Sequence, residues 1–332
     1  DGTSLNINRN TIRDYGGTAS VSRKAIFVDT PPTGDITFRD VSVDDNMVEG
    51  YEGGGPDTSY GIHIFDDGQS TDTGFWNNTS ISRNQITEAS YSLVLESGQP
   101  GNRQSTFTNL NVDNNQGRDW LLGGFWLEGN TLLGVGGKLF NVSVSNNEFI
   151  TNRLPTTDAY GIRFTFGTSA AVTTYAGAIR NLSVNNNKVH YFNTNDNENN
   201  GIWFNYSFGE PEGTALNIQF HGNQISNCRG SCMTIQFYGG VDLNAQNEIT
   251  DVVYMSNLSV AGNQLERPDD AESWLGANPE AQPSNFNIYL YGISLQNFHF
   301  RDNTSDVFTS GGSVRNLAFT TTYGASATDF AD

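Results

Sequence analysis

Apolar and polar residues alternate in short stretches that recur along the chain, and each stretch ends near the same polar residue. The stretch LSVNNNKV at 182–189 shows the pattern, because two apolar residues alternate, three asparagines follow, and an apolar residue returns at Val189. Eight other stretches read apolar-x-apolar-x-x-Asn-x-apolar, and the last position fails only at Gly117 and Ser305. The nine stretches span residues 5–12, 41–48, 79–86, 110–117, 142–149, 182–189, 218–225, 258–265 and 298–305.

The asparagine of this pattern returns at steps of between 31 and 40 residues. A short strand that carries one fixed turn residue, repeated at such a period, is typical of a solenoid. The residues are Asn10, Asn46, Asn84, Asn115, Asn147, Asn187, Asn223, Asn263 and Asn303.

A second alternating strand lies between these stretches. Its second and fourth residues are apolar in every copy, which is the period of two expected for a strand with one buried face. Gly, Asn, Ser and Thr interrupt every candidate for helical spacing. The pattern therefore predicts a chain of strands. The copies span residues 61–65, 92–96, 124–128, 161–165, 201–205, 232–236 and 287–291.

Stacked parallel coils explain why asparagine follows the first strand. Identical positions of successive coils lie about 4.8 Å apart along the axis. A tight bend often needs a left-handed backbone, which Asn tolerates better than most residues. The side-chain amides can then bond from coil to coil as a ladder. Asparagine that merely fills polar turns is the alternative, and nine recurrences at one offset argue against it.

These motifs resemble the right-handed parallel β-helix of pectate-lyase-like enzymes and phage tailspikes, over roughly residues 4–320. The resemblance implies an all-β fold, a single-stranded right-handed parallel β-helix of about nine to ten coils with an asparagine ladder. We expect one domain over 1–332 that lacks both end caps and so forms a fragment of a longer chain. The fold carries lyases, hydrolases and adhesins, so it does not define the chemistry.

Composition limits the expected cellular location and the expected classes of binding partner. The formal net charge is −19, with 17 basic against 36 acidic residues, so nucleic acid and anionic membranes are poor partners. No apolar run approaches 18 residues, which predicts no membrane span. We expect an extracellular or virion-surface protein, and the tailspike resemblance makes a homotrimer the candidate assembly.

Two local features add little to the functional prediction. Cys228 and Cys232 lie in CRGSC, where a disulfide and two buried free thiols are equally compatible with the spacing. The glycosylation sequons at Asn78, Asn141 and Asn181 are interpreted as by-products of the repeat, and in the last two the asparagine is expected to precede a strand.

Any chemistry must lie on the outward positions of the second strand, because the inward positions are apolar. Tryptophan, tyrosine, arginine and acids on such a surface favour a polysaccharide groove, since aromatic faces stack on sugar rings and polar groups bond hydroxyls. The candidate substrate-binding residues are His63, Trp126, Arg163, Trp203 and Tyr289. One outward column reads His63, Val94, Trp126, Arg163, Trp203, Thr234 and Tyr289, and the next reads Phe65, Glu96, Glu128, Thr165, Asn205, Gln236 and Tyr291.

Glu96 and Glu128 occupy one column on adjacent coils and are the leading catalytic candidates. Their carboxylates could approach to roughly 5 Å, near the separation in retaining glycosidases, and their proximity would raise one pKa. Solvated surface acids are one alternative, and a ligand groove without catalysis is another. Loops at 98–106 or 129–139 could also cover this face.

Asp66 and Asp67 are weaker catalytic candidates at the end of the same strand as His63. The resemblance implies that they could bind Ca²⁺, the one candidate cofactor, although an acidic turn is the simpler interpretation. The four histidines show no metal-binding spacing, so no metal site is predicted. The polygalacturonase motifs are absent, and no lysine lies on this face to act as a lyase base. These absences count against both named mechanisms.

Three functional classes therefore follow from the sequence. The first is a hydrolase or lyase that degrades a polysaccharide or cell-surface glycan, as tailspike depolymerases do. The second is a non-catalytic glycan-binding adhesin, and the third is a structural fibre or filament component. Paired acids beside aromatic residues favour the first two, and we expect recognition of a glycan with degradation as the leading activity.

Overall fold

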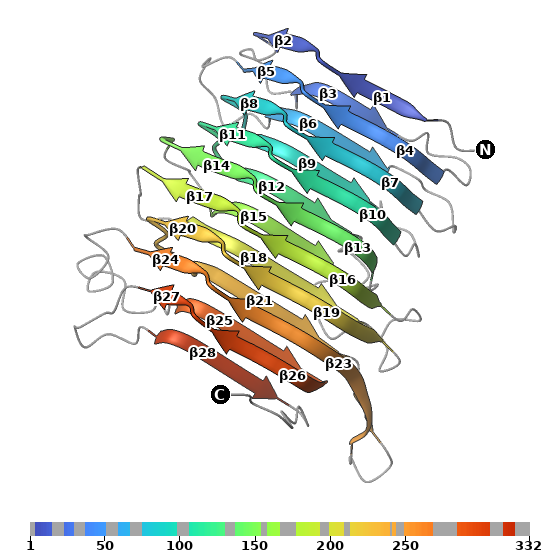
Figure 1. Ribbon diagram of the computed structural model, residues 1–332, viewed down its shortest axis with the longest axis vertical. Coiled ribbons are helices and arrows are strands. Elements are labelled where there is room, and N and C mark those ends of the chain that lie inside the picture. The colour runs from blue at the N-terminus through green and yellow to red at the C-terminus, as the bar shows by residue number, and fades with distance from the viewer. Residues whose placement is uncertain are drawn as a thin grey trace.

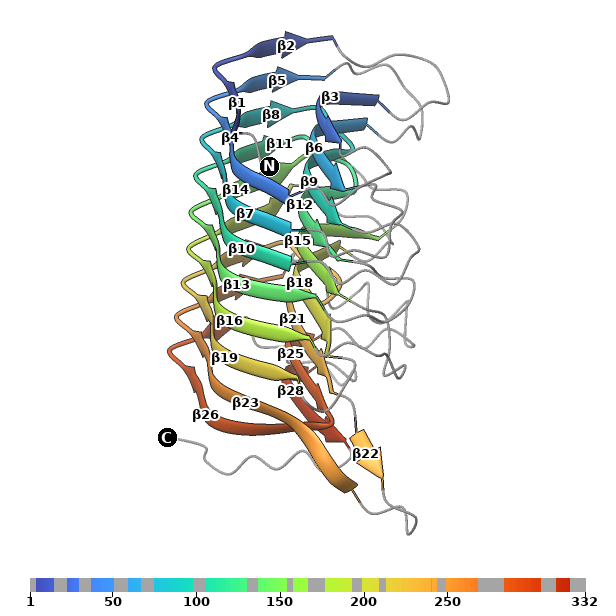
Figure 2. The ribbon, with the colours of Figure 1, turned by 90° about the vertical axis from the view of Figure 1, so that its right-hand side faces the viewer.

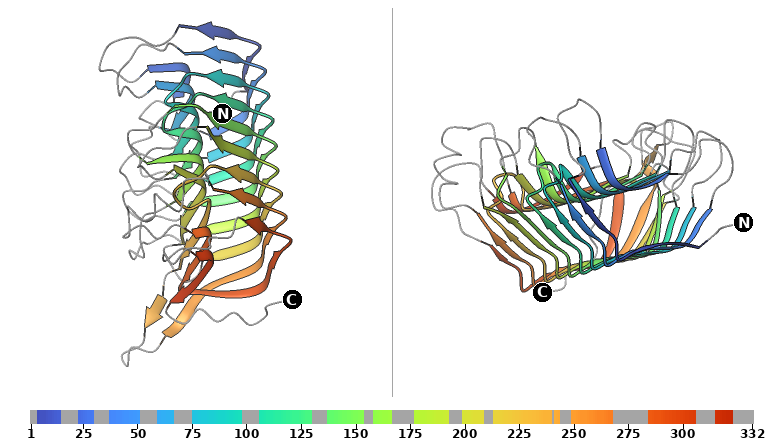
Figure 3. Two further views of the ribbon diagram at one scale, coloured as in Figure 1. Left: turned by 90° about the vertical axis from the view of Figure 1, so that its left-hand side faces the viewer. Right: turned by 90° about the horizontal axis from the view of Figure 1, so that it is seen from above.

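The chain forms a right-handed parallel β-solenoid, as the sequence predicts, and in the described residues each of its sheets has nine parallel strands (Figure 1). The coils stack along one axis, and three sheets form the walls of the coil (Figures 2 and 3). This computed structural model describes residues 4–14, 23–29, 37–50, 59–66, 75–97, 106–129, 137–153, 158–166, 177–192, 199–208, 213–239, 241–243, 249–267, 284–305 and 315–322.

The first sheet contains the strands that the asparagine pattern marks. Its strands pair in parallel in register, and a short antiparallel strand, β22 (Val241–Leu243), extends the start of β23. The parallel strands are β1 (Leu5–Asn8), β4 (Thr37–Asp44), β7 (Phe75–Ser82), β10 (Thr106–Asp113), β13 (Lys138–Ser145), β16 (Ala178–Asn185), β19 (Thr214–His221), β23 (Ile249–Ala261) and β26 (Ile293–Arg301).

The second sheet is narrow and follows the first after a corner of two residues. Its strands are β2 (Thr11–Arg13), β5 (Met47–Glu49), β8 (Gln85–Thr87), β11 (Gln116–Arg118), β14 (Glu148–Thr151), β17 (Lys188–Tyr191), β20 (Gln224–Ser226), β24 (Gln264–Glu266) and β27 (Thr304–Ser305).

The third sheet contains the second alternating strand of the sequence. Its strands are β3 (Arg23–Asp29), β6 (Ser59–Asp66), β9 (Tyr91–Ser97), β12 (Gly123–Glu128), β15 (Ala159–Phe166), β18 (Asn199–Ser207), β21 (Met233–Tyr238), β25 (Ser284–Tyr291) and β28 (Arg315–Thr322).

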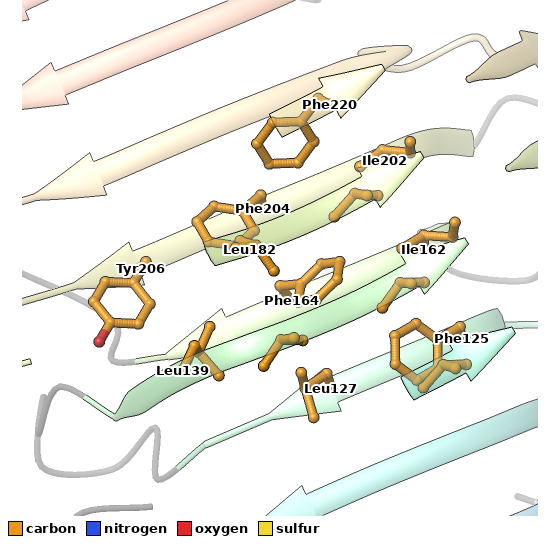
Figure 4. Close-up of a cluster of buried hydrophobic side chains, with 14 of the residues drawn as sticks. Phe125, Leu127, Leu139, Ile162, Phe164, Leu182, Ile202, Phe204, Tyr206 and Phe220 are labelled. Atoms are coloured by element: carbon orange, nitrogen blue, oxygen red, sulfur yellow. The ribbon is translucent and has the colours of Figure 1, made fainter. Parts of the chain in front are cut away.

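The core fills the inside of the coil with rows of apolar side chains that repeat from coil to coil. Phe164 and Phe204 lie in one inward row of the third sheet, with ring centroids 5.3 Å apart (Figure 4). Phe220 of the first sheet packs edge-on against Phe204, and Leu139 and Leu182 of the first sheet belong to the same buried core. Because this interior is closed to solvent, a ligand of the described strands would meet their outward faces.

The predicted asparagine ladder is present at the corner between the first and second sheets. Asn187 donates from Nδ2 to Asn223 Oδ1 and to the Val144 carbonyl, and its Oδ1 accepts from the backbone N–H and the side chain of Asn147. Equivalent amide-to-amide bonds of 2.8–3.1 Å join all nine positions. Each interior amide therefore has its hydrogen bonds satisfied inside the protein.

One part of the explanation for this asparagine is wrong. The ladder residues do not adopt the left-handed backbone; the residue before each one does, as at Asn186 (φ 54°) and Gly222 (φ 63°). The run Asn185–Asn187 therefore has three roles, in which the first residue ends the strand, the second turns the chain and the third stacks. The turn position is occupied by Asn, Asp, Gly or Arg, whereas the ladder position is always Asn.

A second, exposed ladder runs along the outer face of the first sheet and was not predicted. Its residues have a positive φ inside the strands, and each asparagine donates from Nδ2 to the side-chain oxygen of the preceding coil, opposite to the buried ladder. Asn78, Asn141 and Asn181 belong to it, so the last two lie within strands, not before them. The ladder comprises Asp40, Asn78, Asn109, Asn141, Asn181, Asn217, Asn257 and Asn297.

Cys228 and Cys232 form a disulfide, which resolves the alternative that the spacing left open. Both residues are fully buried. The buried Arg267 donates to the backbone carbonyls of Cys228, Arg229 and Gly230 and so holds the loop that the disulfide closes. In the part of the chain that the structure describes, no helix has the length and apolar character needed to cross a membrane.

Candidate functional site

The outward face of the third sheet, hereafter the third-sheet face, carries side chains that change from coil to coil. The predicted alignment of its strands holds from β6 to β21, but β25 is shifted by two residues, so Asn287 and not Tyr289 follows Thr234. Tyr289 instead lies beside Gln236. A two-residue shift keeps every side chain on the same face, which is why apolar alternation alone could not set this register.

Five aromatic rings form a continuous row along this face, hereafter the aromatic band. The centroids of successive rings are 5.1, 4.6, 6.0 and 5.6 Å apart. The band crosses five coils, or about 19 Å at about 4.8 Å a coil. All five side chains are half-buried. The members are Tyr60, Tyr91, Trp126, Tyr160 and Trp203.

The three tyrosines of the band were missed by the sequence analysis, although a signal was present. Tyr60, Tyr91 and Tyr160 each lie three residues before the outward residue of their strand, beyond the five-residue windows that were aligned. They pair in one register column, in which Gly123 takes the third place, between Tyr91 and Tyr160. A side chain at Gly123 would meet the indole nitrogen of Trp126, because a Cβ there would lie 2.3 Å from it. The glycine therefore lets Trp126 fill the gap between Tyr91 and Tyr160.

Glu96 is paired with a buried histidine. Its Oε2 lies 3.3 Å from Nε2 of His63, whose ring is stacked on Tyr60 with centroids 4.5 Å apart. His63 is only 3% exposed, so this predicted substrate-binding residue lies mostly beneath the surface. Since a carboxylate only accepts hydrogen bonds, Nε2 is the donor in this contact.

Glu128 is paired with an arginine that also stacks on the band. Its Oε1 lies 3.7 Å from a terminal nitrogen of Arg163, whose guanidinium carbon lies 4.3 Å from the Trp126 ring centroid. Arg163 also donates from Nε to Thr165 Oγ1 at 2.9 Å. Burial raises the pKa of the Glu128 carboxyl, Arg163 opposes this shift, and the Glu96 carboxylate adds to it.

The two glutamates are register partners on adjacent strands, so their backbones lie one coil apart. Their partners lie in opposite directions along the axis, with His63 one coil before Glu96 and Arg163 one coil after Glu128. Their surroundings also differ, because the Glu96 side chain is 34% exposed and that of Glu128 is 20% exposed. Identical side chains in unequal surroundings are suited to an acid and an anion.

Four side chains of the third-sheet face bury a polar atom that has no hydrogen-bond partner. These atoms are His63 Nδ1, Trp126 Nε1, Asn205 Oδ1 and Thr234 Oγ1. Leaving such an atom unpaired costs about 1–3 kcal/mol, so each one favours a water or a ligand group that can bond to it. Thr234 is fully buried, and Asn205 is half-buried on the adjacent strand.

The described residues form no site around the weaker catalytic candidates, Asp66 and Asp67. Asp66 ends β6 opposite Ser97, and Asp67 lies outside the described residues, as do most residues of the loops at 98–106 and 129–139. Among the described residues, no group of three or more His, Cys, Asp or Glu is placed to hold a metal ion. The aromatic band and the two paired glutamates are therefore the candidate functional features of the third-sheet face.

No model of a protein family matches the chain, and no curated protein matches it either.

Proposed function

We propose that the third-sheet face binds a polysaccharide that runs along the solenoid axis. The observation that carries this proposal is the aromatic band, whose five rings lie on one outward face and are flanked by a column of acids and amides. Aromatic rings on an outward strand face offer stacking surfaces, and the neighbouring polar groups offer hydrogen bonds to hydroxyls.

The unpartnered polar atoms support the same proposal. A closed structural face would leave few buried donors or acceptors unpaired. Here His63, Trp126, Asn205 and Thr234 each carry one. A hydroxylated ligand would supply partners for them.

Cleavage of the bound glycan is the second candidate function, and the unequal glutamates favour it. Glu128, whose pKa is raised, would donate its proton to the leaving glycosidic oxygen. Glu96 would attack the anomeric carbon and form a glycosyl ester, which water would then hydrolyse as Glu128 takes the proton of that water. Alternatively, Glu96 would take the proton of a water that attacks the anomeric carbon directly. A relationship to tailspikes or pectate-lyase-like enzymes, a homotrimer, and an extracellular or virion location remain parts of this proposal.

One screen tests binding and cleavage separately. The protein is run through gels that contain members of a polysaccharide panel, and the same polymers are assayed for new reducing ends and for absorbance at 235 nm. Retardation with new reducing ends is the expected result; an increase at 235 nm would assign a lyase instead. Retardation without products would leave a binding protein, and no retardation on any polymer would overturn the proposal.

A further inference from the structure

We infer that the glycan bound by the third-sheet face is uncharged and is recognised through its hydroxyls. This inference rests on the proposed function and names its ligand class. Polysaccharides that carry carboxylates or sulfates require cations at their binding site, whereas neutral ones require stacking surfaces and hydrogen-bonding groups.

The cation inside the aromatic band is already matched by an acid. Arg163 lies against Glu128, whereas Lys24 of β3, the register partner of Tyr60, lies over the Phe27 ring. An anionic sugar would have to displace Glu128 from Arg163 before it could pair with the guanidinium. The formal net charge of −19 adds a long-range repulsion to this local one.

The unpartnered atoms include an acceptor, which matches a hydroxyl and not an anion. Asn205 Oδ1 attracts the O–H of a sugar but repels a carboxylate or sulfate oxygen. Thr234 Oγ1 can donate or accept, and Trp126 Nε1 donates. The set therefore offers both kinds of partner that a sugar hydroxyl needs. Burial raises the pKa of Tyr91 to about 12, so its hydroxyl stays uncharged at neutral pH.

Polymers that differ only in charge test the inference. Retardation is compared for dextran and dextran sulfate, and for methyl-esterified polygalacturonan and polygalacturonate, alongside neutral mannans, galactans and other glucans. Each gel is run at low salt and at 0.5 M NaCl. We expect retardation by at least one neutral polymer, no retardation by its charged counterpart, and a change of less than about twofold with salt, because stacking is not screened.

A matched variant pair sharpens the result. Glu128→Gln leaves Arg163 without its carboxylate, so this variant is expected to gain weak, salt-sensitive retardation by the charged polymers. Glu148→Gln, on the second sheet, removes an acid that pairs with Arg118 and Lys188 away from the face, and it should gain nothing.

The outcomes separate the two claims. Retardation by charged polymers alone, lost in high salt, would overturn the inference and leave glycan binding intact. Retardation by neutral polymers that persists in Trp203→Ala would place the binding elsewhere and overturn both claims. The absence of retardation by any polymer, charged or neutral, would also overturn both.

Discussion

The corner between the first two sheets and the outward face of the third sheet follow opposite rules. At the corner the same asparagine occupies nine coils and makes the same hydrogen bonds in each. On the face, neighbouring coils present a histidine, a valine, a tryptophan and an arginine at one position. Identical residues in register can bond to one another from coil to coil and so stabilise the stack. A column whose residues change cannot form such a repeated set of bonds.

The comparison indicates where function lies in a solenoid of this kind. A position that repeats is explained by the fold, because each copy satisfies its neighbours. A position that varies, and that leaves polar atoms unpartnered, needs an explanation from outside the fold. Changes at the corner should therefore alter stability and leave binding intact, and changes on the face should do the reverse.

The largest expected effect is on turnover. Glu128→Gln keeps the shape of the side chain but removes its proton, so hydrolysis of the polymer identified by the screen should fall about a hundredfold or more while binding persists. In the unaltered protein the protonated form is lost as pH rises through the raised pKa of Glu128, so kcat should fall on the alkaline side. Unchanged turnover in this variant would remove Glu128 from the chemistry.

The next effect is on stability at the corner. Asn187→Ala deletes two donated and two accepted bonds in a fully buried place, so the free energy of unfolding should fall by about 1–3 kcal/mol. Chemical denaturation measures this change, and gel retardation of the folded variant should match that of the unaltered protein. A variant as stable as the parent would show that the ladder contributes little.

Glycan binding should weaken when a residue of the third-sheet face is substituted, and should stay the same when a residue elsewhere is substituted. Trp203→Ala removes the last ring of the aromatic band, and truncation of an anchoring aromatic residue weakens binding by about tenfold or more. Tyr254→Ala is the matched control, because Tyr254 is 61% exposed on the outer face of the first sheet. Equal losses of binding in the two variants would contradict the assignment of the face.

The smallest effect is expected at the exposed ladder. Asn181→Gly keeps a residue that tolerates the positive φ and removes only a solvent-exposed amide, so the loss should stay below about 0.5 kcal/mol. Asn181→Ala should cost more, because alanine is strained at that φ. A loss in Asn181→Gly as large as that in Asn187→Ala would show that burial does not distinguish the two ladders.

The sequence could predict the fold because the repeat is periodic and the ladder asparagine has one role in every coil. It could not place the left-handed residue one position earlier, since Asn, Asp, Gly and Arg all occupy that position. It could not set the register of β25, where Asn287 and Tyr289 are both outward. The pairs Glu96–His63 and Glu128–Arg163 join different coils, and a linear pattern states which residues share a column but not which atoms meet.

The aromatic band shows the same limit. Its tyrosines precede a place where two successive residues, Gly61 and Ile62 in β6, are both buried, so simple alternation fails just where Tyr60 turns outward. Trp126 reaches that column only because Gly123 leaves room for it. Side-chain packing across coils, which no single stretch encodes, therefore completes the band.

Hydroxyl-radical footprinting with mass spectrometry tests the central claim most directly, because it reports each aromatic residue in one experiment. Oxidation is measured with and without the polysaccharide that retards the protein, and Tyr254 serves as the internal control. The account predicts that the polymer protects Trp203 and Trp126 and leaves Tyr254 unchanged. Protection of Tyr254 with no change at the two tryptophans would contradict it and would place the glycan on the first sheet.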